Sequence, residues 1–384
     1  MSSEVVVVER NSSAKNRLTT IAFFVIAIFA LFTTSLNWWR QVTGDVFDPN
    51  QSGDWLLNYS GGFVRRGLFG EIIDTMVPKS VNMIVVTGAI QILLLVALFA
   101  LVGALYLRSD RSPAWLMLCL SPAVLLFPAV NPEGAFRKEL LALIVLGVLA
   151  LGARNGITTS GLVIALSIYF LAVFSHEASI VALPGILFLV YFFSATKREA
   201  LTKAWLALFI GISVIGFLTS ILVPSNQSRL QAICDSWIER GISECNSGAL
   251  SSLTMSTQES ISFLHSNYFP SYFAYLLIIA LTLIPLFAVR FLPAEWRFSL
   301  VVLLFVLPLF LVAWDYGRWI YLAVSQLTLV ALALASRGKL KTPVRVPLVA
   351  ALVYVLAWGF AWYETPWREG FAIQVLQALA IIPQ

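Results

Sequence analysis

The chain has 384 residues, of which 59% are hydrophobic and only 12% are charged. Soluble domains usually carry about 25% charged residues, so this composition excludes an ordinary soluble protein. The net charge of +5 does not indicate nucleic-acid binding, because in a membrane protein the position of the charges matters more than their sum.

Eleven apolar runs are long enough, with their flanks, to cross a bilayer. A transmembrane helix needs roughly 20 apolar residues. The sequence therefore predicts an all-α polytopic membrane protein with about 11 transmembrane helices, in which residues 1–18 form a cytoplasmic arm and residues 19–384 a single transmembrane domain. The predicted spans are 19–38, 81–107, 113–130, 140–152, 158–174, 179–195, 204–223, 270–289, 298–314, 319–336 and 346–362.

The first span, 19–38, follows a polar arm without a small-residue cleavage site, which predicts an uncleaved signal anchor. With the N-terminus in the cytoplasm, the cytoplasmic segments hold 15 of the 25 basic residues but only five of the 20 acidic ones. Every short cytoplasmic loop then contains Lys or Arg, as the positive-inside rule requires. We therefore expect a cytoplasmic N-terminus.

The first outer loop, at about 39–80, is rich in glycine and aromatic residues and contains Asp54 and the adjacent Arg65 and Arg66. Paired guanidinium groups suit a phosphate or pyrophosphate, because each offers forked donors. Alternatively, the two arginines anchor the loop to lipid headgroups.

The spacing after Arg65 also predicts an amphipathic helix lying at the membrane interface. Arg65, Phe69 and Ile72 would share one face of this helix. Arg66 and Asp74 would share another face.

A second polar cluster contains Arg137, Lys138 and Glu139 at the start of a span. A charged group near the middle of the bilayer costs roughly 2.5–3.5 kcal/mol, so such groups normally face a polar cavity. The alternative is that Glu139 pairs locally with a basic neighbour and the cluster simply ends the span.

A third cluster consists of His176 and Glu177, closely flanked by apolar sequence. Neighbouring residues on a helix point about 100° apart, so these side chains do not simply pair with each other. Both are candidates for proton transfer, and the alternative is an ordinary interfacial histidine. His265 is the only other histidine, so the sequence indicates no metal site or other cofactor, although a divalent metal remains compatible with it.

The longest polar loop, at about 224–268, holds Cys234 and Cys245. If this loop lies outside the cytoplasm, the two cysteines are expected to form a disulfide. Cys119 lies within an apolar run and is expected to be a packed core residue.

A fourth cluster, with Asp315 and Arg318, separates two apolar spans. It could be a tight turn with a local ion pair, or Arg318 could reach into a cavity shared with the other clusters. The predicted orientation places all four clusters at the same side of the membrane.

This arrangement resembles polyprenyl-phosphate-dependent glycosyltransferases of the C-type fold. These have a cytoplasmic N-terminus, many spans, and a first outer loop with interfacial helices and an essential acid. The resemblance implies that Asp54 is the catalytic acid, with Asp45 and Asp48 as competing positions.

The chain also resembles O-antigen and exopolysaccharide polymerases and ligases, which use arginines at the outer face, and sometimes a histidine, to handle undecaprenyl-pyrophosphate glycans. The residues that fit this resemblance are Arg65, Arg66, Arg137, Arg318 and His176.

Together these features predict an inverting glycosyltransferase in the bacterial inner membrane that makes cell-surface polysaccharide, by single-sugar transfer or by polymerisation. Its partners would be a polyprenyl-linked sugar donor, a glycan or lipid acceptor, and membrane lipid. The catalytic candidates are Asp54, His176 and Glu177, and the candidates for binding substrate or phosphate are Arg65, Arg66, Arg137, Lys138, Asp315 and Arg318.

Two other functions remain open. A transporter or flippase of a lipid-linked or anionic substrate would place its charges near the midplane, often with repeated halves. A non-catalytic assembly subunit would need none of the cluster residues for turnover.

Overall fold

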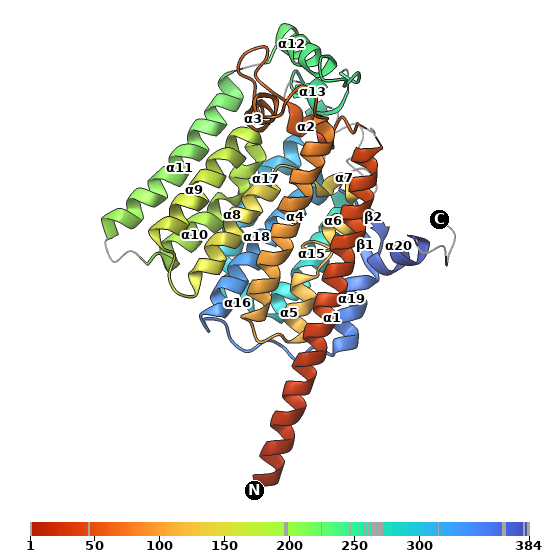
Figure 1. Ribbon diagram of the computed structural model, residues 1–384. Helices are drawn as coiled ribbons and strands as arrows, with labels where there is room; N and C mark the ends of the chain where they lie inside the picture. The colour runs from red at the N-terminus through yellow and green to blue at the C-terminus, as the bar shows by residue number, and fades with distance from the viewer. Residues whose placement is uncertain are drawn as a thin grey trace.

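The computed structural model is a bundle of helices with one small β-hairpin (Figure 1). It describes residues 2–44, 47–195, 199–223, 225–245, 247–255, 258–259, 261–262, 272–313, 315–362, 366–378 and 381. Its elements are α1 Ser2–Thr43, α2 Gln51–Leu56, α3 Leu68–Met76, α4 Met83–Leu107, α5 Pro113–Cys119, α6 Phe127–Val130, α7 Pro132–Ala135, α8 Leu140–Ala153, α9 Thr159–Ser175, the 3-10 helix η1 Glu177–Ala182, α10 Leu183–Phe193, α11 Glu199–Leu222, α12 Gln227–Ile238, α13 Gly248–Ser251, α15 Tyr272–Ala288, α16 Phe291–Ala294, α17 Trp296–Val312, α18 Tyr316–Ser336, α19 Leu348–Leu356, β1 Trp358–Phe360, β2 Trp367–Glu369 and α20 Phe371–Ala378.

Four helical stretches within the described residues are long and apolar enough to cross a membrane: Asn16–Thr43 of α1, α4, α11 and α18. Shorter apolar helices lie beside them, including α8, α9 and α17. Most of α18 is buried, as expected for a helix that is apolar on all sides and packs against α8, α10, α15 and α17. Most of α11 is exposed, so this helix forms the edge of the bundle (Figure 1).

Two predicted spans are replaced by shorter elements in the structure, and a third, 179–195, begins as the 3-10 helix η1 before α10. The run 113–130 is broken into α5 and α6, and the segment between them contains Pro122, which disfavours helical backbone at the residue before it. The run 346–362 gives only the nine residues of α19, which is about 14 Å of helix and too short to cross the hydrocarbon core.

The last part of that run forms β1, which pairs with β2 beyond the run in a β-hairpin that the all-α prediction did not include. Strands β1 and β2 are antiparallel, and Gly359 lies opposite Arg368. The hairpin segment packs closely on α18, where the amide of Gly317 donates to the carbonyl of Trp362 at 3.1 Å. A Cβ atom on Gly317 would lie only 2.1 Å from the carbonyl oxygen of Ala361, so this contact requires glycine.

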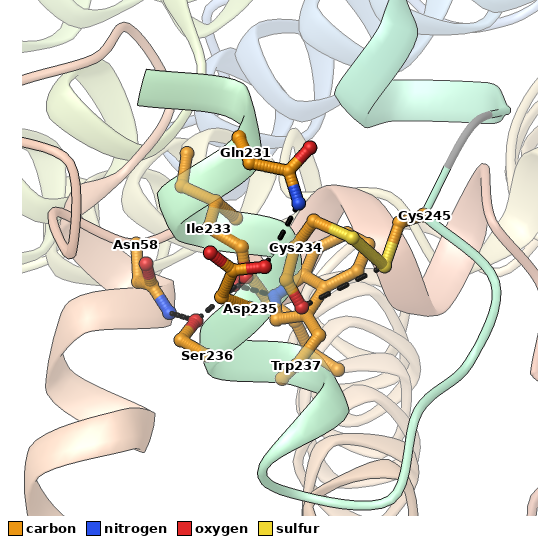
Figure 2. Close-up of a disulfide and its surroundings, with 9 residues drawn as sticks. Asn58, Gln231, Ile233, Cys234, Asp235, Ser236, Trp237 and Cys245 are labelled. Carbon is orange, nitrogen blue, oxygen red and sulfur yellow. Dashed lines mark hydrogen bonds between the residues drawn. A yellow bond between two sulfur atoms is a disulfide. The ribbon is translucent and has the colours of Figure 1, made fainter. Parts of the chain in front are cut away.

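Short helices gather at one end of the bundle, opposite the end from which α1 projects (Figure 1). Helix α2 packs against α3 and α13 there. A disulfide joins Cys234 of α12 to Cys245, with Cα atoms 5.3 Å apart (Figure 2). Nearby, the side-chain amide of Asn58 donates to Ser236, which ties α12 to the loop after α2. Cys119 is a buried free thiol.

Candidate functional site

The four polar clusters meet in one buried network at the end of the bundle that carries α2 and α3. The contributing segments are α2, the loop before α3, residues 137–139, the junction of α9 with η1, and the start of α18. A buried charge is costly unless it is paired, so segments so distant in the sequence are held together by the ion pairs described below.

Asp54 is the centre of this network, and only 1% of it is exposed. Within the described part of the chain, neither carboxylate oxygen has a hydrogen-bond partner. The Nζ atom of Lys138 lies 4.0 Å from Oδ1 of Asp54 and donates to the carbonyl of Arg66 at 2.8 Å. Burial alone would raise the pKa of Asp54, but the surrounding cations, above all Lys138, hold the pKa below its usual value. Asp54 is therefore ionised, as a proton acceptor must be.

Lys138 is fully buried, and this burial lowers the pKa of its ammonium group to about 8, although the charge of Asp54 acts in the opposite direction. Near neutral pH the Asp54–Lys138 pair is therefore ionic. A proton could leave Lys138 more easily than it leaves an exposed lysine.

Arg66 binds Glu177 rather than facing an open site. Its Nε atom donates to both carboxylate oxygens of Glu177, at 3.0 and 2.9 Å, and its Nη2 atom donates to Oε1. The ion pair uses the guanidinium donors of Arg66 that were predicted to bind a phosphate. It also uses the carboxylate of Glu177, the alternative candidate for the base.

The predicted helix after Arg65 begins later than expected. Arg66 has a positive φ of 68°, so the chain turns there, and α3 starts only at Leu68. The prediction that Arg66 and Asp74 share a helical face is therefore wrong. Asp74 instead accepts a hydrogen bond from Arg240 at 3.1 Å, which attaches α3 to the segment after α12.

Arg65 lies at the edge of the network. Its Nη2 atom donates to the carbonyl of Ser252 at 2.8 Å, its Nη1 atom lies 4.0 Å from Glu177, and 27% of its side chain is exposed. Among the described residues its Nε atom has no acceptor. Arg65 and Arg66 line a small cavity whose walls include Phe63 and Phe174. Other wall residues come from α11, the helix at the edge of the bundle: Gly216, Thr219 and Ser220.

Glu139 and Arg318 form the second ion pair of the network, with a hydrogen bond from Nη2 of Arg318 to Oε1 of Glu139. Arg318 also donates to Asp315 at 2.5 Å. The expected local Asp315–Arg318 pair therefore exists together with a distant partner, whereas the alternative of a local pair for Glu139 is wrong. Burial opposes ionisation of Glu139, yet the charges of Arg318 and His176 hold its pKa at about 2.

His176 lies beside this pair, with Nε2 3.7 Å from Oε1 of Glu139. Its Nδ1 atom accepts a hydrogen bond from the amide of Ala178 at 3.1 Å. The hydrogen-bond pattern therefore assigns the proton of the neutral ring to Nε2, which faces Glu139. His176 thus caps η1 and lies beside Glu139. Its charge also helps to lower the pKa of Asp54, but no hydrogen bond joins these two side chains.

Arg137 projects to a different side from Lys138. It donates to the carbonyl of Asn50 at 2.6 Å and its guanidinium lies 5.2 Å from the centre of the Trp362 ring. With Glu139 and Arg318 it lines a second small cavity. Residues 137–139 thus take part in both surroundings, because Lys138 between them donates to the carbonyl of Arg66, which lines the first cavity.

Asp48 and Asp45 are the two acids that compete with Asp54 as the predicted catalytic acid. Asp48 accepts hydrogen bonds from the amides of Asn50 and Gln51, at 2.8 and 2.7 Å, and so supports the start of α2. Asp45 lies outside the described residues. Tyr321, which the sequence analysis missed, follows Arg318 by three positions on α18 and lines the same cavity; that helical spacing could have revealed it.

Glu139 was likewise not among the predicted site residues, although its place in an apolar region pointed to a buried partner. Among the described residues, no group of three His, Cys, Asp or Glu side chains could hold a metal ion. The anionic groups of the site are instead balanced by arginine and lysine.

Comparison with known proteins gives a family for this chain. The model of the family described as "Uncharacterised membrane protein Rv1490" matches residues 53–267, which is more than half of the chain. No curated protein and no solved structure matches. The match includes Asp54, Arg66, Lys138 and Glu177, and it places the apolar helices in a membrane. The chain is therefore a member of the family of uncharacterised membrane protein Rv1490.

Proposed function

We propose that this protein is a glycosyltransferase that uses a polyprenyl-(pyro)phosphate-linked sugar at the outer face of the bacterial inner membrane, for cell-surface polysaccharide synthesis. The observation that carries the proposal is Asp54, an ionised carboxylate that is almost completely buried and has no hydrogen-bond partner among the described residues. A buried acceptor without a hydrogen bond is costly to maintain, which favours a role in binding or proton transfer.

In this proposal Asp54 accepts the proton of the acceptor hydroxyl as that hydroxyl attacks the sugar. The attack forms the new glycosidic bond and breaks the bond to the lipid phosphate, which leaves as an anion. Nearby cations offset the charge that develops on this leaving group. His176 and Glu177 have other partners, so Asp54 is preferred to them as the base.

The cavity beside Arg65 encloses about 10 Å³ and suits one oxygen atom of the phosphate end of a lipid donor. It combines two arginines and one carboxylate with apolar walls, so its local charge is positive. One wall is α11, whose other face exposes apolar side chains such as Phe217 and Leu218. A donor that is dissolved in the membrane could therefore approach from the side. Arg66 acts here mainly by holding Glu177, and Arg65 is the better phosphate contact.

The orientation of the proposal places the network outside the cytoplasm. The disulfide at the same end favours an oxidising compartment. At the opposite end, Arg108 and Arg337 donate to the carbonyls of Leu151 and Ala153 at 2.7 and 2.6 Å, as basic residues do near cytoplasmic helix ends.

A transporter of a lipid-linked substrate is the second candidate, and the closure of the network favours it. Asp54, Lys138 and Glu139 are nearly inaccessible, as in an occluded transport site. Against this candidate, the ion pairs join segments that meet at the end of the bundle carrying α2 and α3, whereas transporters bind substrates near the midplane.

The test compares Asp54→Asn with Asp48→Asn in a reconstituted transfer assay with a polyprenyl-linked donor. Asp54→Asn preserves size but removes the proton acceptor, so turnover should fall by about 100- to 10,000-fold. Asp48→Asn retains an acceptor oxygen for the α2 amides and should stay active. Full activity of Asp54→Asn would exclude the catalytic role. Loss of activity in both variants alike would also count against it.

A further inference from the structure

The cavity lined by Arg137, Glu139, Arg318 and Tyr321 has a specific chemical pattern. It encloses about 10 Å³, roughly the room for one oxygen-sized group. Each of these four side chains belongs to a residue that is more than nine-tenths buried. The cavity therefore accepts one small polar group.

Four polar atoms of these side chains lack a hydrogen-bond partner among the described residues. They are Nε of Arg137, Nε of Arg318, Oη of Tyr321 and Oε2 of Glu139. A buried polar group without a partner costs about 1–3 kcal/mol, and more when it is charged. Four such atoms on residues that line one cavity therefore favour a binding site over a chance defect of packing.

The mixture of donors and acceptor decides the chemistry of the ligand. The two Nε atoms can only donate, the ionised Oε2 atom can only accept, and the tyrosine hydroxyl can do either. A phosphate oxygen could accept from both arginines, but it would be repelled by Glu139. A hydroxyl group can accept from an arginine and donate to Glu139 at the same time.

The local charge leads to the same conclusion. Arg137 and Arg318 carry two positive charges, and Glu139 and Asp315 carry two negative charges beside them. The site is therefore already neutral, so it offers little attraction to a phosphate. The cavity beside Arg65, with its excess of positive charge, is the better place for an anion.

We propose that the cavity bounded by Arg137, Glu139, Arg318 and Tyr321 binds a hydroxyl group of a sugar, the neutral part of the substrate. This inference rests on the proposed function, and it changes the assignment of Arg137 and Arg318 from phosphate binding to sugar binding. Trp362 stacks on Arg137 and lies in the segment that packs on α18, so it would report on occupation of the cavity.

The experiment measures binding without turnover. Purified full-length protein, in a detergent without a sugar headgroup, is titrated with D-glucose, D-galactose, D-mannose and L-rhamnose, and separately with inorganic phosphate and pyrophosphate. Tryptophan fluorescence and thermal stability follow binding up to about 100 mM ligand, a range that covers millimolar affinity. At least one sugar should give a saturable response.

Tyr321→Phe keeps the ring but removes the hydroxyl, and it should weaken binding of that sugar about tenfold. It should leave the response to phosphate unchanged. The matched control is Tyr354→Phe. The hydroxyl of Tyr354 donates to the carbonyl of Leu281 at 3.0 Å, and Tyr354 is not among the residues that line this cavity. Tyr354→Phe should bind the sugar like the unaltered protein.

Two results would overturn the proposal. One is that none of the four sugars gives a saturable response, as expected if the cavity holds only a water molecule. The other is that Tyr321→Phe weakens binding of phosphate but not of sugar. Asp54→Asn should still bind the sugar. If only the catalytic proposal fails, sugar binding remains, whereas if the sugar site is wrong, the saturable sugar response is absent.

Discussion

Arg66 and Glu177, separated by 111 positions in the sequence, form a two-pronged ion pair that fixes the loop before α3 to the start of η1. The backbone carbonyl of Arg66 in turn accepts the hydrogen bond from Lys138, the residue beside Asp54. The ion pair therefore positions the groups around Asp54, and its role differs from direct phosphate binding.

The first prediction concerns this pair. Arg66→Lys should destabilise the protein, because an ammonium group cannot reproduce the planar fork of donors. Both side chains are about one-fifth exposed, which weakens the interaction by solvent screening. In a double-mutant cycle with Glu177→Gln, monitored by thermal unfolding in detergent, we expect a clear coupling between the two positions.

The matched control is the exposed pair of Lys79 and Glu239, with an Nζ–Oε2 distance of 2.7 Å. Solvent screens this pair, so Lys79→Met and Glu239→Gln should show almost no coupling. Equal coupling in the two cycles would contradict the positioning role of Arg66.

The second prediction concerns acid stability. The pKa of Glu139 in the folded protein is held at about 2, below the usual 4.5. Its contribution to stability is therefore complete above about pH 4.5 and is lost as the pH falls toward 2. Glu139→Gln should lower the melting temperature at neutral pH and flatten its fall in this acid range. Parallel curves for the two proteins would show that Glu139 does not provide the acid-sensitive interaction.

The third prediction concerns the disulfide of α12. Mass spectrometry of protein digested without reductant should find the peptides of Cys234 and Cys245 joined. Replacing both with serine should cost roughly 2–3 kcal/mol, because the cross-link restricts the unfolded chain and a separation of only 11 positions restricts it less than a long loop would. The loss should be local, with faster hydrogen exchange in α12 and unchanged exchange in α8. Two free thiols in untreated protein would refute the cross-link.

The fourth prediction concerns orientation in the membrane. Ser60→Cys and Lys341→Cys place exposed thiols in the segment between α2 and α3 and in the segment between α18 and α19, which lie at opposite ends of the bundle (Figure 1). In intact cells an impermeant thiol reagent should label the first and not the second, because the positive-inside rule places the Lys341 segment in the cytoplasm. Labelling only at position 341 would reverse the orientation. Cys119 is buried, and replacing it with alanine gives a clean background.

The sequence by itself determined that the chain is a helical membrane protein and where most of its helices lie. This was possible because the length and apolarity of a span are local properties of the chain. The same reasoning found most residues of the buried network, since charges in an apolar context need a polar environment. It failed at 113–130 and 346–362, where proline and tertiary packing replace a continuous helix by shorter elements.

Only the tertiary structure decided which charge meets which. Arg66 pairs with Glu177, and Arg318 pairs with Glu139, which lies 179 positions away. No local spacing encodes such pairs, because they depend on how α8, α9 and α18 pack together. The same packing leaves Asp54 without a hydrogen-bond partner among the described residues, and it directs Arg137 and Lys138, neighbours in sequence, to different surroundings. Burial makes each of these pairings costly to break, and burial is a property of the folded chain alone.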